Sequence, residues 1–139
     1  NAGRTCLATG ATLHLIEPLG FSLDDKQVKR AGLDYWEHVD LQVWPGWDDF
    51  ERQLPSLGQE YFFSTRASRQ LWDAPLGEPA DVVLIFGRET GGLAPGIHEK
   101  YRDRFLTMPI QSPLVRSLNL STSVGIAVYE VLRQRRMRG

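Results

Sequence analysis

The stretch LIFGRETGGLAP, Leu84 to Pro95, carries the clearest structural signal in the chain. It completes the run DVVLIF, Asp81 to Phe86, whose unbroken apolar character predicts a strand of a parallel sheet that is buried on both faces. Gly87, a charged pair and two further glycines follow directly. Ligands of open α/β sheets bind beyond the carboxyl ends of the strands, so this loop is a candidate ligand loop.

The glycines of this loop leave two interpretations open. Gly91 and Gly92 permit positive φ, and Gly87 lets another backbone or a flat ligand approach closely. A plain tight turn would use glycines in the same way. The loop contains neither GxGxxG nor the GK[ST] of a P-loop, which disfavours a phosphate cradle.

Strand and helix patterns alternate along the rest of the chain. This alternation predicts an α/β fold around a mostly parallel sheet. No internal repeat or linker is visible, so the 139 residues are expected to form a single domain. The expected strands are residues 12–16, 38–43, 61–64, 81–86 and 105–110, and the expected helices are residues 24–31, 47–54, 95–101 and 119–137.

Composition and charge narrow the class of protein. The chain is 42% hydrophobic and 24% charged, as globular proteins are, and it lacks the apolar run of about 20 residues that a membrane helix needs. Its net charge of −1 lacks the overall basic character of a nucleic-acid binder. Arg133, Arg135, Arg136 and Arg138 crowd the C-terminus, which is also typical of a solvated helix end.

Cysteine and histidine usage argues against disulfides and metal sites. The single cysteine, Cys6, allows no internal disulfide and favours a reducing compartment, which we expect to be the cytoplasm. The three histidines are far apart, and one cysteine offers no zinc-ligand spacing, so no metal is expected.

A second polar constellation precedes the longest expected helix. Between Met108 and Gln134 the sequence runs from a strand end through RSLNLSTS, residues 116–123, into the helix. Asn119, Ser121 and Thr122 can each cap the helix, although capping needs only one side chain. The apolar positions that recur at helical spacing are Val124, Ala127, Val128, Val131 and Leu132.

Three segments in this order resemble the SPOUT RNA methyltransferases. They are NAGRTCLATG at residues 1–10, LIFGRETGGL at residues 84–93, and MPI at residues 108–110 followed by RSLNLSTSVGIAVYE at residues 116–130. Within that superfamily, HLIEPLGFSLDDKQVKRAGLDYWE at residues 14–37 is similar to the small tRNA enzymes that methylate the ribose of the wobble nucleotide.

The resemblance implies a particular architecture. It predicts one domain over residues 1–139, with a mostly parallel sheet, helices on both faces and a C-terminal trefoil knot, and with a first strand preceding Asn1. It also implies a homodimer in which the C-terminal helix and the N-terminal segment meet at the two-fold axis. The tRNA substrate would then contact basic residues of both subunits.

The resemblance further implies a cofactor, S-adenosyl-L-methionine, which leaves the reaction as S-adenosyl-L-homocysteine. The cofactor would lie in a bent shape between the loop after Phe86 and the segment before Val124. The residues implied to bind it are Phe63, Ser64, Gly87, Glu89, Gly92, Met108, Pro109, Ile110, Ser117, Leu118 and Ser123.

The implied reaction is methyl transfer to a ribose 2′-hydroxyl, with Arg4, Glu89, Ser117 and Asn119 as catalytic candidates. In related enzymes the arginine at the Arg4 position is given the role of base. Arginine is a cation in proteins, which favours a different role, in which Arg4 binds a substrate phosphate and stabilises alkoxide charge. Ser117 and Asn119 would orient the ribose or the loop. Glu89 could instead pair with an arginine, and Tyr129 could belong to the core or to the site.

Three other functions remain open from the sequence. The first is a SPOUT ribose methyltransferase for another tRNA position or for ribosomal RNA. The second is a catalytically silent RNA-binding relative, which would bind the cofactor without transferring a methyl group. The third is an unrelated nucleotide-binding α/β enzyme.

Overall fold

The computed structural model describes residues 2–17, 37–78, 80–88 and 92–138. The chain divides into two compact units, Asn1–Pro55 and Ser56–Gly139, and each contains its own parallel sheet. The helix expected at residues 24–31 lies outside the described residues. Among the helices that are described, none is both long and apolar enough to cross a lipid bilayer.

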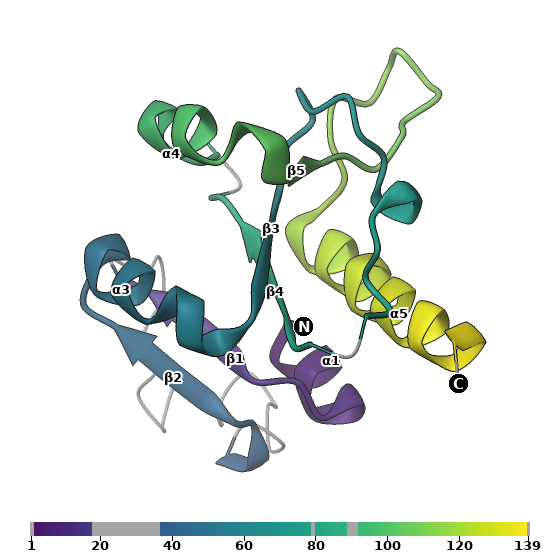
Figure 1. The fold of residues 1–139 in the computed structure, drawn as a ribbon. Coiled ribbons are helices and arrows are strands. Elements are labelled where there is room, and N and C mark those ends of the chain that lie inside the picture. The colour runs from purple at the N-terminus through teal and green to yellow at the C-terminus, as the bar shows by residue number, and fades with distance from the viewer. Residues whose placement is uncertain (1, 18–36, 79, 89–91, 139) are drawn as a thin grey trace, which may run out of the picture. The chain divides into compact units, whose positions relative to one another are not determined.

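The N-terminal unit is built on a pair of parallel strands. β1 (Leu13–Ile16) and β2 (Leu41–Trp44) pair in register from Leu13 opposite Leu41 to Ile16 opposite Trp44, and Figure 1 shows them side by side. The helix α1 (Ala2–Thr9) precedes them, and α3 (Trp47–Leu57) follows. α1 buries Cys6, and burial raises the pKa of its thiol, so the side chain is a neutral, unpaired cysteine.

An aromatic cluster joins the elements of this unit. The indole Nε1 of Trp44 donates to Nδ1 of His14 at 3.0 Å, which links β2 to β1. The Phe50 ring of α3 meets both of these rings edge-on, at 5.4 Å from His14 and 5.6 Å from Trp44. Burial lowers the pKa of His14, although Asp40 opposes the shift, and a neutral imidazole is the form that can accept the indole proton.

The C-terminal unit contains a three-stranded parallel sheet in the order β4-β3-β5. Its strands are β3 (Gln59–Phe63), β4 (Val82–Phe86) and β5 (Phe105–Leu106). Phe63 lies opposite both Phe86 and Leu106, so the carboxyl ends of all three strands lie at the same end of the sheet (Figure 1). The residues that follow the three strands therefore emerge side by side.

One long helix covers the core of this unit. α5 (Leu120–Arg138) buries Ala127 and Val131 against the sheet and its connections. The short helices are η2 (Leu71–Asp73), α4 (Pro95–Lys100) and η3 (Arg102–Arg104). The other buried members of the core cluster are Tyr61, Leu71, Ala74, Leu76 and Leu106.

Most expected elements are present, with three corrections. The strand expected at 105–110 pairs with β3 only over Phe105–Leu106, because β3 ends at Phe63, and Thr107 bridges to Gln70 instead. The expectation that residues 81–86 are buried on both faces is wrong, since only Ile85 of β4 is buried. β4 is an edge strand of its sheet, which leaves its side chains half covered. The third correction is α1, which was not expected.

Candidate functional site

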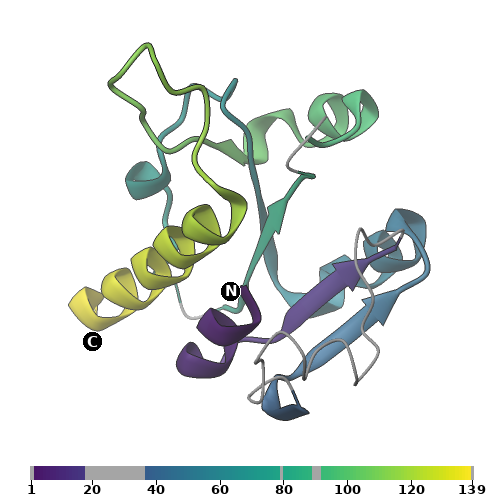
Figure 2. The same cartoon turned by 180° about the vertical axis from the view of Figure 1, so that it is seen from behind.

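A cavity of about 760 Å³ lies at the carboxyl ends of β3, β4 and β5. This volume falls within the range of about 300–1,000 Å³ that is usual for small-molecule sites. All the residues that line it belong to the C-terminal unit. They come from the segment after β3, the loop after β4 and the segment between β5 and α5, which Figure 2 shows from behind as it leads into α5.

The structure brings together most of the residues that the sequence singled out for cofactor binding. Of the expected set, Pro109 does not line the cavity, and Glu89 lies outside the described residues. The expected residues that do line it are Phe63, Ser64, Gly87, Gly92, Met108, Ile110, Ser117, Leu118 and Ser123.

Two aromatic rings form an apolar wall of the cavity. Phe63 ends β3 and Phe86 ends β4, and the parallel register sets them opposite each other. Their rings stack with centroids 4.5 Å apart and only 6° between their planes. Met108 and Ile110 add apolar surface to the lining. This wall suits a flat, weakly polar ring system.

The glycine loop folds back on the end of β4. A Cβ at Gly87 would lie 2.5 Å from the carbonyl carbon of Gly92 and 2.6 Å from the nitrogen of Leu93. Gly92 has φ of +60°, and its N–H donates to the carbonyl of Arg88 at 3.2 Å. From the sequence, Gly87 could allow close approach of either another backbone or a flat ligand. In the structure, the backbone of Gly92 and Leu93 in the same loop approaches it.

The amino end of α5 forms another part of the lining. Oδ1 of Asn119 accepts hydrogen bonds from the N–H groups of Ser121 at 2.9 Å and Thr122 at 3.4 Å, so Asn119 is the cap among the three candidates. The hydroxyl of Ser121 also donates to it at 2.6 Å. The side-chain oxygen of Asn119 thus caps the amino end of α5. The positive end of the helix dipole is directed at the cavity wall.

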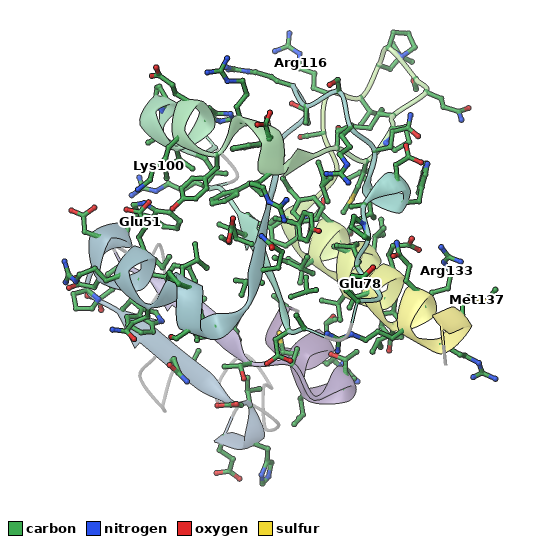
Figure 3. The ribbon with its side chains drawn as sticks, viewed as in Figure 1. Glu51, Glu78, Lys100, Arg116, Arg133 and Met137 are labelled. Carbon is green, nitrogen blue, oxygen red and sulfur yellow. The ribbon has the colours of Figure 1, made fainter. Side chains whose placement is uncertain are left out.

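Three arginines that the cofactor prediction did not include also line the cavity. Arg66, Arg88 and Arg116 are all exposed, and within the described ranges none of them forms an ion pair. Arg116, labelled in Figure 3, lies on the segment between β5 and α5. Arg66 and Arg88 closely follow strands that end at the cavity, and that position is the signal that could have identified them.

Two further candidate residues, Arg4 and Tyr129, do not line the cavity. Arg4 is exposed on α1 in the N-terminal unit. Tyr129 does not line the cavity and is 56% exposed on α5, so it is not a core residue of this chain. Among the described residues, no group of three or more histidine, cysteine or acidic side chains could hold a metal ion.

Comparison with known proteins identifies the family. The model of the SpoU rRNA Methylase family matches residues 1–129. A tRNA (cytidine(34)-2′-O)-methyltransferase from Burkholderia pseudomallei (strain 1106a) is 43% identical over 141 residues, which cover 100% of this chain and 88% of that protein. A protein of the same name from Burkholderia ambifaria is 41% identical, with coverage of 100% and 88%.

Solved structures agree with this assignment. A structure described as giving structural insights into the 2-OH methylation of C/U34 on tRNA has a TM-score of 0.87 and 41% identity, and covers 99% of this chain and 87% of its own. The SpoU methyltransferase AviRb from Streptomyces viridochromogenes, in complex with AdoMet, shares the fold with a TM-score of 0.75, 20% identity and coverage of 97% and 52%. The chain belongs to the SpoU methylase family.

Proposed function

We propose that this protein transfers a methyl group from S-adenosyl-L-methionine to the ribose 2′-hydroxyl of the wobble nucleotide, position 34, of tRNA. The observation that carries the proposal is the single cavity in which nine of the residues expected to bind the cofactor come together. The relatives named for this reaction match the chain over its whole length at 43% identity, which supports the choice of substrate.

The residues of the cavity fit the proposed cofactor. Phe63 and Phe86 offer an apolar wall for the adenine, and Met108 and Ile110 add to it. Ser117 precedes α5 and Ser123 lies in its first turn, and both offer hydroxyl groups to the carboxylate of the cofactor. The positive end of the helix dipole would also favour this carboxylate. When bound, S-adenosyl-L-methionine would supply a methyl carbon activated by its positive sulfur.

The remaining catalytic requirements fall to the chain itself. The cavity wall would hold the donor in one orientation, and alignment of reacting atoms accounts for a large part of rate enhancement in such transfers. Arg4 would act as a cation that binds a substrate phosphate bidentately and stabilises the developing alkoxide. The guanidinium is a poor base, so a phosphate oxygen would accept the hydroxyl proton. Ser117 would help to orient the ribose.

The same proposal includes the homodimer, the trefoil knot and a cytoplasmic location. α5 carries Ile126, Tyr129 and Leu132, which are 40%, 56% and 37% exposed, and such an apolar helix surface favours a second copy of the chain as its partner. The knot would lie in the part of the chain between the glycine loop and α5. A single unpaired cysteine agrees with a reducing compartment.

Methyl transfer to defined RNA tests the function. Purified protein, S-adenosyl-L-methionine with a tritiated methyl group and unmodified tRNA should yield label at the ribose of nucleotide 34, mapped by nuclease digestion. Label at another tRNA position or in ribosomal RNA would replace this substrate with the alternative one. Cofactor binding without any transfer would indicate a silent relative.

Arg4→Ala tests the mechanism within that assay. The variant should bind S-adenosyl-L-methionine as the wild type does, while transfer falls about 100-fold or more, because a cation that stabilises the transition state is lost. Arg52→Ala, at an exposed arginine of α3, serves as the control and should retain activity. Full turnover by Arg4→Ala would refute the role of Arg4 but leave the reaction intact.

A further inference from the structure

A second cavity, of about 460 Å³, adjoins the first in the C-terminal unit. The two cavities share Ser64, Arg66 and His98 in their linings. The second cavity adds Arg69 and Arg102, which do not line the first. We call it the arginine cavity. None of the roles proposed for the cofactor-binding residues involves Arg69 or Arg102.

The charge of the arginine cavity is strongly unbalanced. The described lining contains three guanidinium groups, those of Arg66, Arg69 and Arg102, and one carboxylate, that of Asp103. As far as the chain is described, none of these four side chains forms an ion pair. Like charges held together without counterions repel one another, and a bound anion would relieve that repulsion. The imbalance is local, because the whole chain has a net charge of −1.

The basic groups come from backbone that is held in place by hydrogen bonds. The carbonyl of Arg69 accepts from the N–H of Thr107 at 2.8 Å, which ties the loop after β3 to the end of β5. The turn at Arg66 is fixed by its N–H, which donates to Oγ of Ser64 at 3.2 Å. Arg102 lies in η3, directly before β5. The cavity is thus organised before any ligand binds, which lowers the entropic cost of binding.

Histidine and serine side chains complete a surface suited to phosphate. The imidazole of His98 stacks on Phe105 with centroids 4.5 Å apart and 19° between the planes, which fixes the ring at the border of the two cavities. Ser64 and Ser68 add hydroxyl donors. Guanidinium forks match phosphate oxygens bidentately, and hydroxyl groups are common additional donors to phosphate.

We propose that the arginine cavity binds a backbone phosphate of the RNA substrate and so positions the target ribose at the adjoining cofactor pocket. This inference rests on the proposed function, because it takes the methyl acceptor to be RNA. Phosphate contacts fix the register of a nucleic acid without reading its sequence. A site that shares Ser64, Arg66 and His98 with the cofactor pocket holds a phosphate close to where the methyl group is delivered.

Arg69→Gln and Arg102→Gln test the site without altering the cofactor pocket, which neither residue lines. Binding of tRNA would be measured by fluorescence anisotropy over a series of salt concentrations. Each variant should bind roughly three- to tenfold more weakly, and the slope of log affinity against log salt should fall by about one, as expected for one lost phosphate contact. Arg102→Lys should keep the slope, because it keeps the charge.

Two further variants make the test specific. Arg52→Gln removes an exposed arginine that lines neither cavity, and its affinity for tRNA should equal that of the wild type. Asp103→Asn removes the one carboxylate that the described lining of the arginine cavity contains, and it should tighten tRNA binding, with most effect at low salt. A gain of affinity cannot arise from a damaged fold. Calorimetry should give the same affinity of every variant for S-adenosyl-L-methionine.

The outcomes separate this inference from the proposed function. If the wild type methylates nucleotide 34 while Arg69→Gln and Arg102→Gln bind tRNA with unchanged affinity and slope, the phosphate site is wrong and the function stands. If the wild type methylates no tRNA, but its tRNA binding still depends on these arginines and on Asp103, the site stands and the function fails. Inorganic phosphate that binds through Arg102, without any effect of Arg102→Gln on tRNA, would indicate a free anion site and overturn the inference.

Discussion

At the scale of single residues, the glycine after β4, Gly87, has no room for a side chain. The space that a side chain would need at Gly87 is filled by the backbone of Gly92 and Leu93, at 2.5 Å and 2.6 Å. Neither group can move away as a flexible side chain can, so any larger residue must displace the loop. The loop lines the cavity proposed for the cofactor, and the shape of that cavity therefore depends on the absence of a side chain at Gly87.

Gly87→Ala is expected to weaken S-adenosyl-L-methionine binding at least tenfold and to destabilise the fold by about 1–3 kcal/mol, as overpacked positions do. Isothermal calorimetry and urea unfolding would measure the two effects. Gly96→Ala is the matched control, because a Cβ there meets nothing within 4 Å, and it should change neither property appreciably. Normal cofactor affinity in Gly87→Ala would show that the loop tolerates displacement.

Asn119 illustrates how far a residue's role can be predicted from sequence. Its type and its position before an apolar helix predicted a cap, and the resemblance to a family added a part in catalysis. The structure confirms the cap, since Oδ1 accepts from the N–H groups of Ser121 and Thr122. Three residues of the segment could have capped the helix, and the sequence did not distinguish them because the choice depends on where the helix begins.

At the scale of elements, α5 is anchored to a turn far away in the sequence. Oε1 of Gln134 accepts from the buried N–H groups of Leu76 at 2.8 Å and Gly77 at 3.2 Å. Nε2 of the same amide donates to Glu130 at 2.8 Å. The helix that forms one wall of the cofactor cavity is therefore fixed at both ends, by Asn119 at its start and by Gln134 near its end.

Gln134→Leu should lower the free energy of unfolding by about 1–3 kcal/mol, because it removes the side-chain oxygen that joins α5 to the N–H groups of Leu76 and Gly77. Urea denaturation followed by circular dichroism would measure the loss. Gln111→Leu, at an exposed position before α5, is the control and should remain within about 0.5 kcal/mol of the wild type. Equal stabilities of the two variants would mean that water replaces the amide at the turn.

The acid stability of the protein should depend on Glu130. The hydrogen bond from Arg133 to this carboxylate, at 2.7 Å, is the main cause that lowers its pKa, and burial opposes the shift. Because the folded pKa lies below the unfolded value of about 4.3, Glu130 contributes stability above that pH, and the contribution is lost as pH falls through the folded pKa. Glu130→Gln should flatten this decline in urea unfolding between about pH 5 and pH 3, whereas Glu99→Gln on α4 should not.

The three-stranded sheet shows that hydrophobic periodicity predicts strands but not their order or their paired length. The apolar run at residues 81–86 correctly predicted β4 but not its place at an edge, because strand order depends on pairing between distant segments. For the same reason the pattern at 105–110 exceeded the two residues of β5, which pair only as far as β3 extends. α1 was missed because eight residues with little apolar repeat give no helical signal.

At the scale of the whole molecule, the apolar surface of α5 leads to a prediction about assembly. Tyr129 is 56% exposed and Leu132 37%, and Figure 3 marks Met137, 76% exposed, near the end of the same helix. A dimer that buries this surface should be disrupted by Tyr129→Glu, which introduces a charge where the isolated subunit already faces water. Analytical ultracentrifugation should show a dimer for the wild type and a monomer for the variant.

A control completes the test of assembly. Gln42→Glu adds the same charge at an exposed position of β2 and should leave the dimer intact. A wild type that sediments as a monomer at micromolar concentration would refute the dimer, and a dimeric Tyr129→Glu would place its interface elsewhere. Circular dichroism would verify that both variants keep the helical content of the parent.

The parallel pairing of the strands has a consequence for biosynthesis. The strand pairs of the described residues are all parallel and none of them can close through a hairpin, so β3 must await β4 and then β5, which follow it by about twenty and forty residues. Such distant pairings fold slowly. The residues of the cofactor cavity extend from Phe63 to Ser123, so a nascent chain on the ribosome cannot assemble it until nearly all of these residues have left the exit tunnel. A half-made chain therefore lacks the complete cavity that we propose for the methyl donor.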